Sequence, residues 1–530
     1  MSRREPIESS ATTRGEAVAP DTATGAAAAA AAALVRSPGD LLRTYNRLLE
    51  AEPDRTVRDM RWMAGQLSRR GVNVNGTLAQ TFVKPDLISL AEHELLGRVV
   101  PQLMSCIERA IAIFDERPDL RPLFGLADDV ASLIELEPVP RGRRMMTVPI
   151  ARLDGFLNRG NLQFIEFNVD SPAGVGYADV IEDLIFATDT CRAFLADGVR
   201  AERVQRRQRL MDALLGYWRD WCELTSADQP AVPRVAITDW TGVATAPEFE
   251  MIQRFLRDHR VPCEIADPRD FTLGRGSQLE LRGQPIDLVL RRALVPELAA
   301  RRDEVRPLLG AISAGTVCVA NPLRSRIASS KALLELLTDH TYDAMFSATG
   351  NEVRHSALPW TRVLRDREVV YDGQSHSLLA LLRDRRSEFV IKPGSGSRGV
   401  GVVIGRETDS ATWIDIVTRA ARRGDHVVQV WVPAPEKTMP VAHLSSTTAT
   451  AGSASGRRSA GAAVAVSGRI AEVDAALAGR ITLVSRKANL GPFALGGEYG
   501  GAIARLSNES IINVALGSGL VPTVAVGPAN

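Results

Sequence analysis

The stretch Phe389-Val-Ile-Lys-Pro-Gly-Ser-Gly-Ser-Arg-Gly-Val-Gly-Val-Val-Ile-Gly405 decides which fold class this sequence indicates. An apolar run leads to Lys392, four glycines follow between residues 394 and 401, and a second apolar run ends at Ile404. Glycines let backbone N–H groups approach an anion closely, and a lysine adds a positive charge. Residues 394–401, called here the glycine loop, are therefore typical of a loop that covers a phosphate.

The glycine loop has three other possible interpretations. Gly394, Gly396 and Gly399 match the dinucleotide-binding spacing G-x-G-x-x-G, but that fingerprint requires a helix after the loop. Residues 400–404 are β-branched and predict a strand instead. Protein kinases also close a hairpin over a triphosphate, but their lysine follows the glycines, and this chain has neither HRD nor DFG. An ordinary glycine-rich hairpin with a surface lysine remains the plain alternative.

The second informative feature is a predicted hairpin centred near Gly160, called here the polar hairpin. If its connection has an odd number of residues, Asp154 faces Glu166 and Arg152 faces Asn168. Residues two apart on a strand share a face, so all four side chains would project from one side.

The polar side chains of this hairpin suit a metal ion and a phosphate. Two carboxylates and an amide oxygen are hard donors, so Asp154, Glu166 and Asn168 predict a Mg²⁺ site. The adjacent Arg152 suits a γ-phosphate or a developing acyl phosphate. A solvated hairpin face with a cross-strand ion pair is the alternative. Asparagine is a poor strand former, which favours the metal site.

The rest of the chain predicts a mixed architecture. Residues 37–136 show helical periodicity, and residues 178–221 do so again. Strand-like runs at 233–239, 262–267, 286–292 and 317–321, with a helix at 246–259, predict a small doubly wound subdomain. A helix is expected to begin at Ser329 and Ser330, another covers 412–423, and a strand covers 426–432.

Composition excludes several classes of function. The net charge of +1 gives no bulk field for nucleic acid or for an anionic membrane, and no apolar run is long enough to span a bilayer. Five cysteines are scattered singly, so we expect a reducing, cytoplasmic location and neither a disulfide framework nor a zinc site. The Ala-rich residues 1–38 and the Ser, Thr, Ala and Gly-rich residues 445–467 are expected to be disordered.

Taken together and in this order, these features resemble the ATP-grasp superfamily. In ordinary ATP-grasp enzymes the acidic and asparagine metal ligands follow the glycine-rich loop, whereas here they precede it. The chain therefore resembles a circularly permuted ATP-grasp protein related to the glutathionylspermidine synthase group. The residues that carry this resemblance are Arg152-Leu-Asp154, Glu166-Phe-Asn168-Val-Asp170, Asn321 to Lys331, Val390 to Gly399 and Gln429-Val-Trp-Val432.

The resemblance implies an α/β (α+β) fold and a role for each matching residue. Asp154, Glu166 and Asn168 would hold Mg²⁺, and Arg152 would contact the transferred phosphoryl group. The residues implied to bind ATP are Lys331, Lys392, Gly394, Ser395, Gly396, Ser397, Gly399, Gln429, Val430, Trp431 and Val432. Catalysis is assigned to Arg152 and Lys392.

The resemblance also marks a region for the second substrate. Asp170, Ser171 and the turn Gly174-Val-Gly176 would lie near the acceptor. Arg291 and Arg292 either reach the acid substrate or pair structurally. Ala504-Arg-Leu-Ser507 looks like a family motif to which no role is assigned.

The expected activity is that of an ATP- and Mg²⁺-dependent ligase that joins a small-molecule carboxylate to an amine through an acyl phosphate. A phosphotransferase on the same scaffold and a non-catalytic nucleotide-binding protein are the alternatives. No cysteine amidase module precedes the ligase part, which leaves the glutathione and spermidine substrates in doubt. The expected parts are 1–38 (tail), 39–144 (helical), 145–230 (polar hairpin), 231–325 (doubly wound), 326–444 (nucleotide binding), 445–467 (insert) and 468–530 (C-terminal part).

Overall fold

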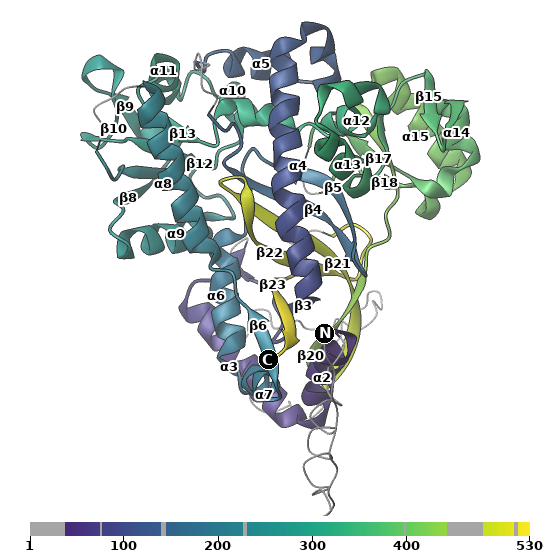
Figure 1. Ribbon diagram of the computed structural model, residues 1–530. Coiled ribbons are helices and arrows are strands. Elements are labelled where there is room, and N and C mark those ends of the chain that lie inside the picture. The colour runs from purple at the N-terminus through teal and green to yellow at the C-terminus, as the bar shows by residue number, and fades with distance from the viewer. Residues whose placement is uncertain are drawn as a thin grey trace, which may run out of the picture.

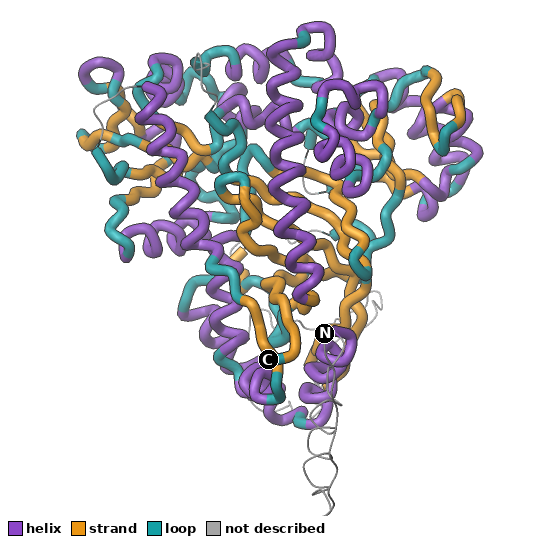
Figure 2. Tube along the Cα trace, in the orientation of Figure 1, coloured by secondary structure: helices purple, strands orange, loops and turns teal. Residues whose placement is uncertain are grey.

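The computed structural model describes residues 38–74, 77–138, 145–225, 230–396, 399–442, 481–512 and 518–529. The expected tail at 1–38, apart from its last residue, and the expected insert at 445–467 lie outside these ranges, as does Ser397. Helices and strands are mixed throughout, and three sheets organise the molecule (Figures 1 and 2). No helix in the described ranges is long and apolar enough to cross a membrane.

The central sheet carries the polar hairpin. Its strand order is β3-β23-β22-β21-β4-β5, with β20 paired to β21 and β6 paired to β23. All of these pairs are antiparallel except β3 with β23. The bounds are β3 (Asp86–Ser89), β4 (Ile150–Asn158), β5 (Asn161–Asn168), β6 (Val199–Glu202), β20 (Glu436–Ala442), β21 (Ile481–Leu495), β22 (Glu498–Ser507) and β23 (Gly519–Pro528).

Helix α4 (Leu90–Glu116) runs across one face of this sheet (Figure 1). It begins at a capping box, in which Ser89 Oγ accepts a hydrogen bond from Glu92 N and the Glu92 carboxylate accepts one from Ser89 N. Apolar residues at helical spacing, such as Leu96, Val100 and Leu103, pack in one core cluster with Leu153 of β4. Because side chains alternate along a strand, Arg152 and Asp154 point away from α4.

The second sheet has the order β14-β19-β17-β18 and carries the glycine loop. Its strands are antiparallel neighbours, with Val390 opposite Ile404 across the loop, so the predicted strand–loop–strand arrangement is confirmed. The returning strand is shorter than expected, since only residues 403–404 pair. The bounds are β14 (Thr361–Val363), β17 (Phe389–Pro393), β18 (Val403–Ile404) and β19 (His426–Val430). Helices α14 (Leu378–Asp384) and α15 (Ser410–Arg423) complete this lobe, whose core includes Trp413.

The third sheet, β13-β12-β7-β8, is parallel throughout and confirms the small doubly wound subdomain. Its bounds are β7 (Val235–Thr238), β8 (Cys263–Ala266), β12 (Leu288–Arg291) and β13 (Cys318–Ala320). Each strand falls inside a run predicted from the sequence. Helices α8 (Arg206–Thr225), α9 (Ala246–Asp258), α10 (Val295–Ala300) and α11 (Arg306–Ala314) lie around it (Figure 1).

Some secondary structure differs from the sequence interpretation. Residues 86–89 and 199–202 were expected to be helical, but they form strands β3 and β6 on β23, far away along the chain. Local periodicity cannot report such a partner, so the helical interpretation was wrong there. The helix that was expected to begin at Ser329 and Ser330 is α12 (Leu333–Thr338), which begins after Lys331 without a serine cap.

The remaining elements connect these layers. They are α2 (Pro38–Ala51), α3 (Pro53–Arg69), β1 (Asn73–Val74), β2 (Thr77–Leu78), η1 (Pro118–Phe124), α5 (Asp128–Ile134), α6 (Val175–Phe186), α7 (Asp189–Ala196), η2 (Pro268–Asp270), β9 (Phe271–Leu273), η3 (Arg275–Ser277), β10 (Leu279–Leu281), β11 (Gln284–Pro285), η4 (Leu323–Ser329), η5 (His340–Met345), α13 (Ala348–Ala357), β15 (Glu368–Tyr371), β16 (Gln374–Ser377), η6 (Arg386–Glu388) and η7 (Gly405–Glu407).

Candidate active site

The register of the polar hairpin brings its polar side chains together. Asp154 pairs with Glu166 and Arg152 pairs with Asn168, as the sequence predicted. The turn that produces this register differs from the expected one. The turn has two central residues, Arg159 and Gly160, both with positive φ, and an irregularity after Asp154 shifts the register. An even turn plus a bulge thus gives the facing pairs that an odd connection would have given.

Asp154 is the centre of a buried charge cluster. Arg152 donates from Nε to Oδ1 at 2.8 Å and from Nη2 to Oδ2 at 3.1 Å. Asn168 Nδ2 donates to Oδ2 at 2.6 Å, and Arg505 Nη2 lies 2.5 Å from the same oxygen. Only 5% of the Asp154 side chain is exposed. Burial acts to raise the pKa of Asp154, but Arg152 and Arg505 outweigh it, so its pKa lies below the ordinary value.

Arg505 is a site residue whose role the sequence did not reveal. It lies on β22 opposite Asn489 of β21, and its guanidinium also contacts Asn489 Oδ1. Asn489 Nδ2 in turn donates to Gly155 O at 3.1 Å. Beside them, a Cβ at Gly491 would lie 3.0 Å from Arg152 Cδ, so this position leaves room for the arginine. The sequence contained the Arg505 motif but no signal that β21 pairs with β4.

Glu166 points toward Lys331 and the glycine loop rather than into the arginine cluster. Its carboxylate lies 3.9 Å from Lys331 Nζ, and its side chain is 29% exposed, against 5% for Asp154. Lys331 Nζ also donates to Gly396 O at 2.9 Å, and its backbone N–H donates to Gly394 O at 3.0 Å. Lys331 thereby joins the polar hairpin to the glycine loop, two segments that are more than 200 residues apart.

Lys392 is buried at the same junction. Its Nζ donates to Gln429 Oε1 at 2.6 Å and to Ile165 O, on the polar hairpin, at 3.2 Å. Burial lowers the pKa of Lys392 to about 8, with Glu166 raising it and Lys331 lowering it by smaller amounts. Gln429 is fixed by a hydrogen bond from its Nε2 to Thr361 Oγ1 at 3.0 Å. The ammonium is therefore held in place before any ligand is bound.

The segment expected to contact adenine follows Gln429. Val430 N donates to Trp360 O at 2.9 Å, and Trp431 N donates to Glu388 O at 2.7 Å. The Arg406 guanidinium lies 3.4 Å from the centre of the Trp431 ring. The N–H groups of Val430 and Trp431 are therefore engaged within the protein, and β19 ends before Trp431 and Val432.

Three glycines of the glycine loop, Gly396, Gly399 and Gly401, have φ values of 126°, 72° and 77°. Backbone with positive φ is open to glycine and strained for other residues. A Cβ at Gly399 would lie 2.4 Å from Ile511 Cγ2, so this part of the loop lies against the connection between β22 and β23. Ser395 is exposed and precedes the first of these positions.

The residues expected near the second substrate form a buried structural network. Arg291 has no exposed side-chain surface, and its Nη1 lies 2.6 Å from Asp170 Oδ1. Arg292 donates to Pro172 O and lies 3.7 Å from Glu248, which itself accepts from Gly174 N and Gly176 N. Two interpretations were open for Arg291 and Arg292, contact with the acid substrate and structural pairing. The structure shows the pairing.

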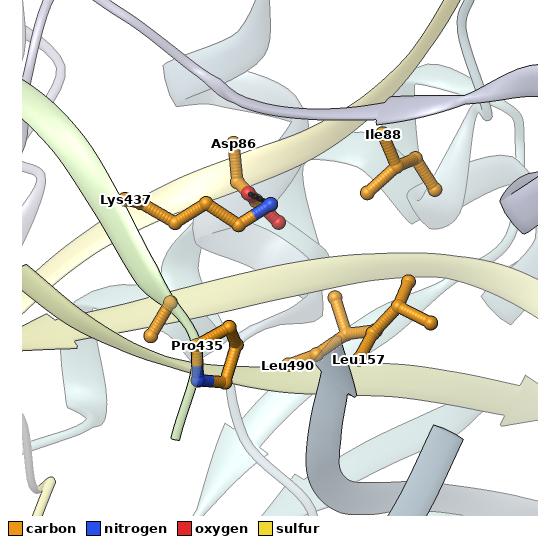
Figure 3. Close-up of a pocket in the computed structure, with 7 residues that line it drawn as sticks. Asp86, Ile88, Leu157, Pro435, Lys437 and Leu490 are labelled. Atoms are coloured by element: carbon orange, nitrogen blue, oxygen red, sulfur yellow. Dashed lines mark ion pairs between the residues drawn. The ribbon is translucent and has the colours of Figure 1, made fainter. Parts of the chain in front are cut away.

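A small cavity lies on the face of the central sheet that is opposite to the Asp154 cluster (Figure 3). Lys437 and Asp86 pair there at 2.8 Å, beside Leu157 and Leu490. Leu490 adjoins Asn489 on β21 and so points to the opposite face. The volume of the cavity that the centre of a water molecule can occupy is about 10 Å³, which is enough for roughly one water. This cavity cannot hold a nucleotide.

Comparisons with known proteins bear on the fold. No protein-family model and no curated protein matches this chain. Among solved structures, it is similar to a glutathione synthetase-like effector, GSS30, from Globodera pallida in its apo form. That likeness has 10% identity and a TM-score of 0.56, and it covers 92% of this chain and 97% of that one.

A putative gamma-glutamylcysteine synthetase from Methylobacillus flagellatus KT is also similar, with 11% identity, 80% and 88% coverage and a TM-score of 0.37, which is too low to support an argument. The first likeness shows a shared glutathione synthetase-like fold. It supports the coarser part of the sequence resemblance, an ATP-grasp-like fold, and does not bear on activity.

Proposed function

We propose that this protein is an ATP- and Mg²⁺-dependent ligase that joins a small-molecule carboxylate to an amine through an acyl phosphate. The observation that carries the proposal is the position of Lys331, whose Nζ lies 3.9 Å from Glu166 and 2.9 Å from Gly396 O. A carboxylate, two lysines and a glycine loop converge there. This is the combination that a metal-bound triphosphate requires.

The residues of the polar hairpin fit a magnesium ion. Glu166 offers a partly exposed carboxylate, and Asn168 has its Oδ1 available while its Nδ2 is bound to Asp154. Asp154, the third proposed ligand, has four donor contacts, three of them on Oδ2, so its Oδ1 is the less engaged oxygen. Magnesium, when bound with ATP, supplies charge neutralisation on the phosphate oxygens.

The protein's own cations divide into two groups around this position. Lys331 and Lys392 flank the glycine loop and would bind the nucleotide phosphates. Arg152 and Arg505 lie on the central sheet, held by Asp154, and would face the phosphoryl group as it is transferred to the carboxylate substrate. Such preorganised charges stabilise the charge that develops in phosphoryl transfer. The proposed adenine contacts are Gln429, Val430, Trp431 and Val432, with Val432 the residue beyond the engaged N–H groups.

The proposed chemistry needs no protein nucleophile. The substrate carboxylate attacks the γ-phosphorus of ATP, which forms the acyl phosphate and releases ADP. The amine then attacks the acyl carbon, phosphate leaves, and one proton is lost from the nitrogen. We further propose the rotated order of a circularly permuted ATP-grasp protein and the part boundaries given above, because the polar hairpin precedes the glycine loop along the chain.

An ADP-release screen of carboxylates crossed with amines tests the proposal. ADP formation is expected to require both substrates and to fall at least about 100-fold in Glu166→Gln, which loses a proposed magnesium ligand, and in Lys392→Met, which loses a positive charge on the phosphates. Glu368→Gln, on an exposed edge of the same lobe, is the matched control and should keep wild-type activity.

Two outcomes would overturn the ligase assignment. If ADP forms with one substrate alone and mass spectrometry finds a stable phosphorylated product, the protein is a phosphotransferase. If the Glu166 and Lys392 variants bind ATP and form ADP like wild type, the site has been placed wrongly.

A further inference from the structure

We propose that His340, Asp343 and His355 form a second metal site, specific for a divalent transition metal of the Zn²⁺ kind. They are the group of metal-ligating side chains that the described residues bring together outside the polar hairpin. One ligand atom from each lies within 4.8 Å of the other two. The site is separate from the proposed ATP site and does not depend on the proposed function.

The three side chains already have nearly the spacing of metal ligands. His340 Nδ1 lies 3.1 Å from Asp343 Oδ2, and His355 Nε2 lies 2.9 Å from Asp343 Oδ1. Two ligands about 2.0–2.1 Å from a tetrahedral zinc ion are roughly 3.3 Å apart, and the two imidazole–carboxylate distances, one to each oxygen of Asp343, differ from that spacing by only a few tenths of an ångström. The two imidazole rings are stacked, with centroids 3.9 Å apart, which brings both nitrogens to one carboxylate.

The surrounding residues hold Asp343 in place. Its Oδ1 accepts from Arg354, a fully buried residue whose guanidinium also donates to Leu337 O and to Asn351 Oδ1. Asn351 Nδ2 donates to Asp343 O at 3.1 Å. The same Oδ1 faces His355 Nε2 and Oδ2 faces His340 Nδ1, so the carboxylate lies between the two imidazoles. Ligating carboxylates are commonly hydrogen-bonded in this way by outer residues.

The donor set selects the metal. Two imidazoles and one carboxylate favour zinc and its neighbours, whereas Mg²⁺ and Ca²⁺ prefer oxygen ligands. Three protein ligands converge among the residues that the structure describes, so at least one coordination position is left for water. The site lies in η5 and α13, and the side chain of His340 is 75% exposed, so an ion can enter from solvent.

A metal here would also stiffen the support of the polar hairpin. Ser356, the residue after His355, accepts a hydrogen bond of 2.6 Å through its backbone oxygen from Gln163 Nε2 on β5. Clamping η5 to α13 therefore fixes one of the contacts that position the hairpin. We expect this role to be structural, because none of the three ligands lies on the polar hairpin or the glycine loop.

Equilibrium dialysis of the full chain against Zn²⁺, with excess Mg²⁺ present to occupy the ATP site, tests the proposal. Wild type should bind about one Zn²⁺, and Co²⁺ in its place should give visible d–d absorption with nitrogen ligation. His340→Ala and His355→Ala should each weaken binding by at least about 100-fold. His376→Ala, on β16, is the matched control and should bind like wild type.

The His340 variant keeps the test decisive, since this exposed side chain can be removed without disturbing the core. No zinc binding by wild type would overturn the proposal. So would zinc binding that survives in both histidine variants, or that is lost only in Glu166→Gln, because the ion would then lie on the polar hairpin.

Discussion

Lys392 Nζ donates a hydrogen bond of 2.6 Å to Oε1 of Gln429, which lies on β19, the strand next to its own strand β17. Its nearest acceptors are this amide and the carbonyl of Ile165, both neutral. A buried ammonium without a touching carboxylate retains much of its attraction for an anion. The contact therefore fixes the orientation of Lys392 and leaves its ammonium without a carboxylate in direct contact, at a cost in stability; under the proposed function this leaves the charge for a phosphate.

The first prediction concerns pH and nucleotide binding. Because the pKa of Lys392 is lowered from 10.5 to about 8, its ammonium deprotonates above pH 8. The affinity for ATP should be constant from pH 6.5 to 7.5 and fall about tenfold per pH unit above pH 8, as measured by calorimetric titration. Lys392→Met should bind weakly at every pH without this dependence. A wild-type affinity that stays level from pH 7 to 9 would contradict the prediction.

The same pKa predicts how stability depends on pH. Between about pH 8 and 10.5 the unfolded chain holds a proton on Lys392 that the folded protein has lost, so this residue makes the free energy of unfolding rise with pH there. Below pH 8 the buried charge costs on the order of 3 kcal/mol. Lys392→Met should therefore be at least as stable as wild type at pH 7 in urea unfolding. A large loss of stability at pH 7 would show that the ammonium is satisfied.

Two variants of the polar hairpin, Asp154→Asn and Glu166→Gln, distinguish a structural role from a catalytic role. Asp154→Asn leaves two guanidinium groups without their buried carboxylate and should destabilise the protein by about 3–5 kcal/mol. Glu166→Gln changes a partly exposed group and should cost less than about 0.5 kcal/mol while abolishing ADP formation. Urea unfolding and the ADP assay measure the two effects. Equal stability of both variants would mean that Asp154 does not organise the arginines.

An alanine substitution tests whether nucleotide binding needs the positive-φ backbone of the glycine loop. Gly396 has φ of 126°, and nothing lies within 4 Å of its Cβ position, so Gly396→Ala acts through the backbone alone. Its affinity for ATP should fall at least about tenfold, because the carbonyl that receives Lys331 would move. Gly276→Ala, with φ of 65° and equally open space, is the matched control, in η3 between β9 and β10. If both variants bind ATP with equal affinity, the backbone conformation of Gly396 does not affect nucleotide binding.

Asn321 supports the polar hairpin from the doubly wound subdomain. Its Oδ1 accepts from Ile150 N at 3.0 Å, and its Nδ2 donates to Ile150 O and Val169 O at 2.6 Å each. Asn321→Ala would leave these buried backbone groups unpaired and should cost about 2–4 kcal/mol in urea unfolding. Asn351→Ala removes a hydrogen-bonded amide from a less buried place and serves as the control, with a smaller loss expected.

Local patterns were sufficient for much of the fold. The parallel strands around residues 235, 265, 290 and 319 and the hairpin around Lys392 lie where apolar runs and glycines predicted them. Such signals are read within one segment, because a buried strand is apolar and a phosphate loop needs glycine wherever they occur. The prediction was wrong for β3 and β6, whose strand conformation depends on pairing with β23.

By itself, then, the sequence determined most of the elements, because side-chain alternation is local, and it predicted that Asp154 faces Glu166, although a two-residue turn and a bulge produce this register. Only the tertiary structure decided how those residues are used. Pairing of β21 with β4 brings Arg505 to Asp154, and packing of η4 against β5 brings Lys331, just after η4, to Glu166. These contacts join segments hundreds of residues apart. Their partners are set by the burial of whole sheets, which no local pattern records.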